Sequence, residues 1–160
     1  MHGEQVAVGT VLVLMLAEEL VKLKPDFEKA RAFARSYDEE AWKKEIERAY
    51  GTAAGEVFQI EAKAKKNDID NRLQRIDSME KNWDTIVAQL KTLPSAAYLR
   101  DLLKDIGCPA VPADIKVDDA ILKDTFMYCK ETRPRYTIFQ TVYDLGLMDE
   151  LSDKIISALK

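Results

Sequence analysis

Few residues in this chain have the types and spacing that chemistry needs. His2 is the single histidine, and a neutral imidazole is a good ligand for zinc, nickel or iron(II). The motifs GxGxxG, GxxxxGK and GxSxG, which bind nucleotides or carry a nucleophilic serine, do not occur. A histidine next to the first methionine is by itself typical of a frayed terminus. The residues taken alone therefore give no complete active site.

Clusters of charged residues supply the other candidates, and each has a structural interpretation. Asp38-Glu39-Glu40 and Asp118-Asp119 come where helical patterns begin. Carboxylates favour the positive end of a helix dipole, so we interpret both clusters as helix starts rather than metal ligands. The lysines at 63, 65 and 66 are interpreted as a solvated helix end. Arg133-Pro134-Arg135 either holds a phosphate or covers a loop.

Composition excludes several classes of protein. With 24 Lys+Arg against 28 Asp+Glu, the net charge of -4 argues against a nucleic-acid or anionic-membrane partner. The two cysteines, Cys108 and Cys129, are too few for a disulfide framework and form no CxxC pair, so a reducing cytoplasm is expected. Trp42, Trp83 and the tyrosines fall at helical spacing and are interpreted as core or interface residues.

The elements that position these candidates are predicted to be helices. Residues 6–17 are nearly all apolar, lack the basic start of a signal peptide and are too few to span a bilayer, which needs about 20. We expect a helix there that is buried on nearly every face. Apolar residues from Ile69 to Leu90 recur every three, four or seven positions and predict one helix of about 20 to 25 residues.

Helix starts and stops support the same organisation. Thr137 with Gln140, and Ser36 with Glu39, have the spacing of a capping box. Gly107 before Cys108-Pro109 indicates a helix stop, and residues 108–118 are the only irregular loop expected. Further amphipathic runs fall at 27–34, 42–50, 57–64, 99–106, 121–129, 138–143 and 151–159. No defensible strand occurs, so we predict one all-α domain over residues 1–160 with about eight or nine helices.

Four segments resemble a known enzyme family, and they occur in the family's order over essentially the whole chain. HGEQVAVGT at 2–10, followed by a long apolar helix, is similar to the HGE-x-V-x-x-G segment of the iron-containing alcohol dehydrogenase superfamily. DEEAWKKEIERAYG, LLKDIGCPAVPADIKV and RPRYTIFQTVYDLGLMDEL, at 38–51, 102–117 and 133–151, are similar to segments of its glycerol-1-phosphate dehydrogenases. Gln5 and Ala7 depart from the family, where Lys and Gly are frequent.

The resemblance implies the helical, C-terminal part of a two-domain enzyme, of the dehydroquinate synthase-like type. Such an enzyme reduces dihydroxyacetone phosphate with hydride from NAD(P), while a divalent metal stabilises the developing alkoxide. It implies that His2 is one of three metal ligands, and that an Asp, another His and the nucleotide-binding domain lie upstream of this chain. A phosphorylated three-carbon substrate and a homo-oligomer are expected. The isolated chain is expected to be inactive, to hold no metal or NAD(P) stably and to contain no catalytic residue of its own.

Two alternatives stay open at this point. The chain could be a self-contained helical interaction or scaffold domain, in which the HGE segment has no functional meaning. It could also be the same helical part of a glycerol or other alcohol dehydrogenase, because the sequence does not show which residues grip a substrate phosphate.

Overall fold

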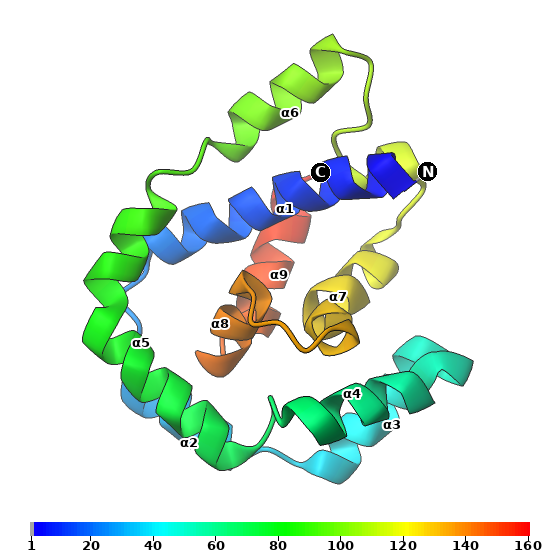
Figure 1. Ribbon diagram of the computed structural model, residues 1–160. Helices are drawn as coiled ribbons and strands as arrows, with labels where there is room; N and C mark the ends of the chain where they lie inside the picture. The colour runs from blue at the N-terminus through cyan, green and yellow to red at the C-terminus, as the bar shows by residue number, and fades with distance from the viewer. Residues whose placement is uncertain (1) are drawn as a thin grey trace. The chain divides into compact units, whose positions relative to one another are not determined.

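A computed structural model describes residues 2–160 of the chain (Figure 1). These residues form nine α-helices and three short 3₁₀ helices, and they contain no strand. The all-α prediction is confirmed. The α-helices are α1 (His2–Lys22), α2 (Phe27–Arg35), α3 (Glu39–Tyr50), α4 (Ala54–Ala64), α5 (Ile69–Leu90), α6 (Ala96–Asp105), α7 (Asp119–Tyr128), α8 (Ile138–Asp144) and α9 (Met148–Ala158). The 3₁₀ helices are η1 (Gly51–Ala53), η2 (Pro112–Ile115) and η3 (Cys129–Thr132).

The chain folds into two compact units, each made of segments that are distant in sequence. Unit 1 contains Met1–Lys24, Asn82–Lys123 and Glu150–Lys160. Unit 2 contains Pro25–Lys81 and Asp124–Asp149. The expectation of a single domain over residues 1–160 stays a prediction. Within the described residues, no helix is both long and apolar enough to cross a membrane.

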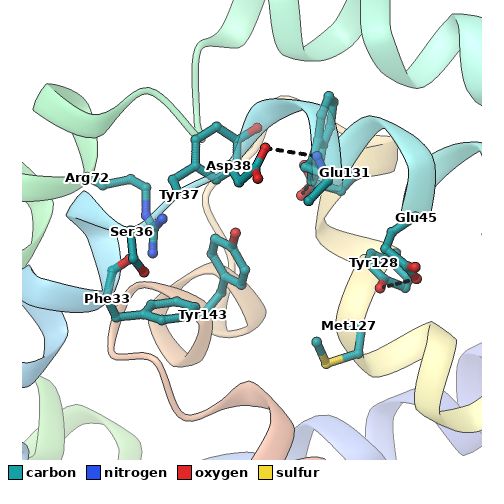
Figure 2. A pocket seen from close by; sticks show the side chains of 12 residues that line it. Phe33, Ser36, Tyr37, Asp38, Glu45, Arg72, Met127, Tyr128, Glu131 and Tyr143 are labelled. Atoms are coloured by element: carbon teal, nitrogen blue, oxygen red, sulfur yellow. Dashed lines mark hydrogen bonds between the residues drawn. The ribbon is translucent and has the colours of Figure 1, made fainter.

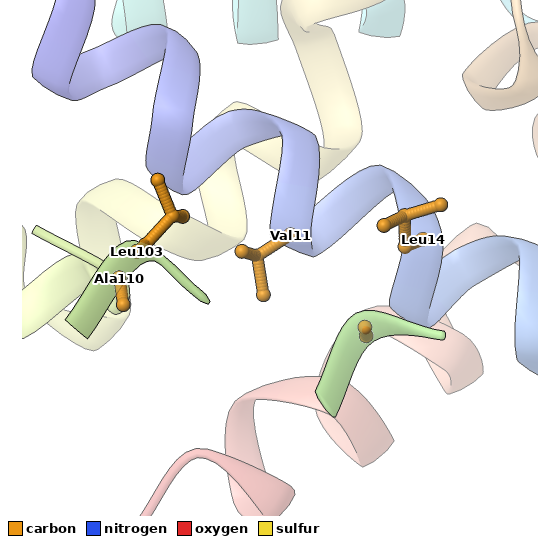
Figure 3. Packing of buried hydrophobic residues seen from close by; sticks show 5 residues of the cluster. Val11, Leu14, Leu103 and Ala110 are labelled. Carbon is orange, nitrogen blue, oxygen red and sulfur yellow. The ribbon is translucent and has the colours of Figure 1, made fainter. Parts of the chain in front are cut away.

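Unit 1 is built around α1. This helix packs against α6 and η2, and Val11, Leu14, Leu103 and Ala110 bury their side chains between them (Figure 3). From residue 11 to residue 21 no side chain of α1 is exposed, as expected for a helix that is apolar on most faces. The first turns differ from the expectation, because Val6 is 53% exposed.

Unit 2 brings α2 against α8 and α3 against α4, while η3 packs on α4 and α8. Ile46 and Val57 are buried between α3 and α4, and the rings of Trp42 and Phe58 lie 5.6 Å apart beside them. The amphipathic pattern of each helix explains this pairing, since each buries one apolar stripe against its neighbour.

Helix ends confirm some of the predicted caps. Asp38 Oδ1 accepts a hydrogen bond from the Ala41 amide at 3.0 Å, and Asp118 Oδ1 accepts one from the Ile121 amide at 2.8 Å. Both acidic clusters therefore cap helices. Gly107 has a φ of +69°, and the Cys108 amide donates to the Leu103 carbonyl, which confirms the predicted stop of α6. The loop that follows is not wholly irregular, because η2 lies within it.

Both predicted capping boxes are wrong. Thr137 stands at the N-cap of α8, but its side chain makes no capping hydrogen bond. Gln140 is fully buried and donates to Asp144 instead of reaching back to the cap. Ser36 ends α2, where its hydroxyl donates to the Phe33 carbonyl, and Asp38 caps α3 in its place. Ser36 and Gln140 thus each bond a partner within four residues instead of the predicted cap.

Gly146 is a position where the fold requires glycine. Its φ of +72° disfavours a side chain, and an added Cβ would lie 3.0 Å from Cγ of Phe33. We expect Gly146→Ala to lower the free energy of unfolding by about 1–2 kcal/mol from the backbone alone, with the contact adding to this. Gly9→Ala is the control, because Gly9 lies inside α1 with open space around it and alanine should stabilise a helix by about 0.5–1 kcal/mol. Urea unfolding of both variants measures the difference; equal midpoints would contradict this account.

Candidate functional site

His2, the predicted metal ligand, lies in the first turn of α1 and is exposed. A catalytic zinc-type site takes three protein ligands and keeps one position open. Among residues 2–160, no three His, Cys, Asp or Glu side chains come together in a way that could hold a metal ion. The described residues therefore supply one donor at His2 and do not by themselves fit a metal site.

A network of buried charges lies in unit 2, at η3. Lys130 and Glu131 are 3% and 1% exposed and form an ion pair with each other. Glu131 Oε1 also accepts hydrogen bonds from Trp42 Nε1 and Asn67 Nδ2, both at 3.1 Å. Lys130 Nζ donates to Asn67 Oδ1 at 3.1 Å and lies 3.7 Å from the centre of the Tyr143 ring. Lys130 and Glu131, two charged residues of η3, are therefore part of a buried polar network in unit 2.

Lys66 belongs to the same network, which corrects its interpretation as part of a solvated helix end. It is 6% exposed, and its Nζ donates to the backbone carbonyls of Lys130 and of Arg133, the latter at 2.9 Å. The chain after α4 turns inward there, because Lys65 adopts a left-handed conformation with a φ of +49°. The ammonium therefore holds the backbone of residues 130–133 in place.

A second buried ion cluster is centred on Asp144 of α8. Its carboxylate accepts hydrogen bonds from Arg72 Nε at 3.2 Å, Arg75 Nε at 2.6 Å and Gln140 Nε2 at 3.0 Å. Arg72 and Asp144 are both fully buried. The Arg72 guanidinium lies 5.1 Å from the centre of the Phe33 ring and 4.6 Å from that of Tyr143, but its Nη1 and Nη2 have no hydrogen-bond partner.

Arg72 and Glu131 both line a cavity of about 240 Å³ within unit 2 (Figure 2). Side chains from α2, α3, α7 and α8 complete its wall, and five of the twelve lining residues are aromatic. Besides the two charged residues named above, the wall contains Phe33, Ser36, Tyr37, Asp38, Ala41, Trp42, Glu45, Met127, Tyr128 and Tyr143. The cavity is the size of a small organic ligand and offers both flat apolar surface and charged groups.

Burial changes the acidity of the groups around this cavity. Desolvation lowers the pKa of the Lys130 and Lys66 ammonium groups and raises the pKa of Tyr143 to about 12. It also raises the pKa of the Cys129 thiol to about 12 and so makes this cysteine a poor nucleophile at neutral pH. The pKa of Glu61 is raised by burial as well.

The sequence pattern does not predict this network. Arg133 and Arg135, which the sequence suggested could hold a phosphate, are exposed, and Arg133 Nη1 donates to the carbonyl of Thr132. One signal was present: Arg72 lies three residues after Ile69 and four before Ile76, on the apolar stripe of α5. A charge on an apolar stripe must be paired or placed beside a cavity. Lys130 and Glu131 carried no such signal, because neighbouring charges are usual on helix surfaces.

The Asp144 cluster should be essential to unit 2. Asp144→Asn removes the carboxylate between two guanidinium groups and leaves Arg72 buried without a counter-charge, so we expect a loss of about 3–5 kcal/mol in unfolding free energy. Asp77→Asn is the control, because Asp77 pairs with Arg31 at 3.0 Å while 53% exposed, and such pairs contribute about 0–1 kcal/mol. Chemical denaturation of the two variants makes the comparison, and a similar small loss in both would show that the Asp144 cluster is dispensable.

Comparisons of the chain with protein-family models, with curated proteins and with solved structures find no match. Membership of the iron-containing alcohol dehydrogenase superfamily therefore stays a prediction that rests on the four sequence segments.

Proposed function

We propose that this chain is the metal- and substrate-binding helical part of an NAD(P)-dependent sn-glycerol-1-phosphate dehydrogenase, which reduces dihydroxyacetone phosphate in the cytoplasm. The observation that carries the proposal is the place of His2. The HGE segment forms the first turn of a 21-residue helix, and its histidine is exposed while residues 11–21 are not. An imidazole at the exposed end of a firmly packed helix is available as a donor and is held by the helix behind it.

His2 supplies one nitrogen donor, and the proposal assigns the remaining Asp and His ligands, together with the nucleotide-binding domain, to the rest of the complete two-domain enzyme. The active enzyme then needs both parts, and a homo-oligomer of the two-domain enzyme is expected. The chain by itself should retain no stoichiometric metal after dialysis, since one donor is too few for a catalytic site.

Substitution of His2 tests this proposal in the complete enzyme. We expect His2→Ala to lose metal and turnover with dihydroxyacetone phosphate together, while far-ultraviolet circular dichroism stays helical. Gln5→Ala, an exposed neighbour on the same helix, should keep both. Elemental analysis and a turnover assay are made on the same samples. If His2→Ala keeps its metal and its rate, the proposed role of this histidine is refuted. If the unmodified enzyme turns over glycerol but not the phosphorylated ketone, the glycerol dehydrogenase alternative is favoured.

A helical interaction module is the second candidate function, and one observation favours it. Tyr98 and Leu102 on α6 and Ile106 at its C-cap follow one another every four residues and are 63%, 45% and 70% exposed. Residues four apart share one face of a helix, so this apolar stripe faces outward along the helix. Exposed apolar patches of this kind commonly mark contact surfaces.

Self-association of the purified chain tests whether this stripe is a contact surface. We expect sedimentation to show association that rises with concentration, together with binding of a hydrophobic dye. The double variant Leu102→Glu, Ile106→Glu should reduce both, because charges oppose burial of the stripe. Lys104→Glu adds a charge change at an exposed position of the same helix and should leave both unchanged. A wild-type chain that stays monomeric and binds no dye would remove this candidate.

A further inference from the structure

The wall of the cavity in unit 2 carries hydrogen-bond donors that no protein group uses. Arg72 Nη1 and Nη2 are buried without a partner. Within the described part of the chain, the hydroxyl groups of Tyr37 and Tyr143 also have no hydrogen-bond acceptor, and Figure 2 shows the Tyr143 hydroxyl directed into the cavity. An arginine guanidinium can donate five hydrogen bonds, of which Arg72 uses the one from Nε.

Each of the three carboxylates on the same wall already accepts at least one hydrogen bond from the protein. Asp38 caps α3 through the Ala41 amide. Glu45 accepts hydrogen bonds from Arg48 Nε at 2.8 Å and from the Tyr128 hydroxyl at 3.0 Å. Glu131 is held by Lys130, Trp42 and Asn67, as described above. The buried side-chain atoms of this wall that lack a hydrogen-bond partner, Arg72 Nη1 and Nη2, are therefore donors.

The balance of buried charge points the same way. Three buried cations, Lys66, Arg72 and Lys130, are matched by two buried carboxylates, Glu131 and Asp144. Two partly buried groups offset each other: Arg75 draws on the same Asp144 carboxylate, and Glu61 accepts a hydrogen bond from the Asn67 amide while its other oxygen has no partner. An excess of buried positive charge is costly unless an anion compensates it. Of these buried cations, Arg72 is the one that lines the cavity, whose wall also carries the hydrogen-bonded carboxylates of Asp38, Glu45 and Glu131. An anion is therefore favoured beside Arg72, where a cation would add to the excess.

We propose that this cavity binds a small oxyanion carried on a flat apolar group, such as an aromatic carboxylate or an aromatic phosphate ester. Its oxygens accept hydrogen bonds from Arg72 Nη1 and Nη2 and from the Tyr143 hydroxyl, since planar guanidinium groups suit carboxylate and phosphate geometry. Its apolar group lies against Trp42, which also lines the cavity, and against Met127, which Figure 2 shows away from Arg72. The Nη atoms are closed off from bulk water, so the ligand reaches them by a small shift of a lining side chain such as Tyr143.

This site is independent of the proposed dehydrogenase function, because it rests on residues of unit 2 and on none of the HGE segment. Binding is measured by calorimetry on the full chain with benzoate and with phenyl phosphate, which separate the two oxyanion classes. Benzamide, which keeps the ring and lacks the negative charge, is the matched neutral probe. We expect at least one of the two anions to bind at least tenfold more tightly than benzamide, the ratio that loss of one charge-assisted hydrogen bond produces.

Two variants assign the binding to the named donors. Arg72→Lys keeps a cation beside Asp144 but removes the planar fork, and should weaken the anion at least tenfold. Tyr143→Phe keeps the ring and removes the hydroxyl, and should weaken it about threefold to tenfold. Tyr98→Phe, on an exposed tyrosine of α6, should bind as the wild type does.

The outcomes separate clearly. If Arg72→Lys does not fold, the proposal is tested by Tyr143→Phe and by the comparison of benzamide with the two anions. The proposal is overturned if neither anion binds the wild-type chain, if benzamide binds as well as the anions, or if Tyr143→Phe binds them with unchanged affinity.

Discussion

Unit 2 depends on the carboxylate of Asp144, which lies fully buried between two guanidinium groups. One α8 side chain thereby fixes Arg72 and Arg75 of α5, although about seventy residues separate them in sequence. Once Arg72 is held at Nε, its guanidinium packs against the neighbouring rings of Phe33 of α2 and Tyr143 of α8, whose centres lie 5.7 Å apart. A close approach of α2 to α8 follows, and it requires Gly146 beside Phe33. Loss of this carboxylate would leave two cations facing each other in a low dielectric.

The second buried ion pair performs a different task in the same unit. Lys130 and Glu131 lie on a short 3₁₀ helix, where few backbone hydrogen bonds fix the chain. Side-chain contacts from Trp42, Asn67 and Lys66 replace them and hold residues 130–133 against α3 and the end of α4. Polar groups buried in this way specify one arrangement, because each is satisfied only when its partners are in place. The cavity beside them owes its shape to this rigid wall.

Unit 1 is organised by packing rather than by charge. The apolar residues of α1 from Val11 onward are covered, and the helix holds its first turn, with His2, at an exposed end. Small side chains at Ala96 and Ala110 let α6 and the loop after it approach α1 closely. The same helix therefore has an exposed first turn, which carries His2, and a buried core behind it.

The sequence by itself determined the helices, because spacing of apolar residues is a local property that reports which face of each helix is buried. It predicted the limits of α5, the stop at Gly107 and the caps at Asp38 and Asp118 from residues within one or two turns. Tertiary structure decided the rest. The burial of Lys66 and the pairing of Arg72 with Asp144 depend on partners far away in sequence. Whether a charged side chain is solvated or buried is settled by what packs over it, and no local pattern records that.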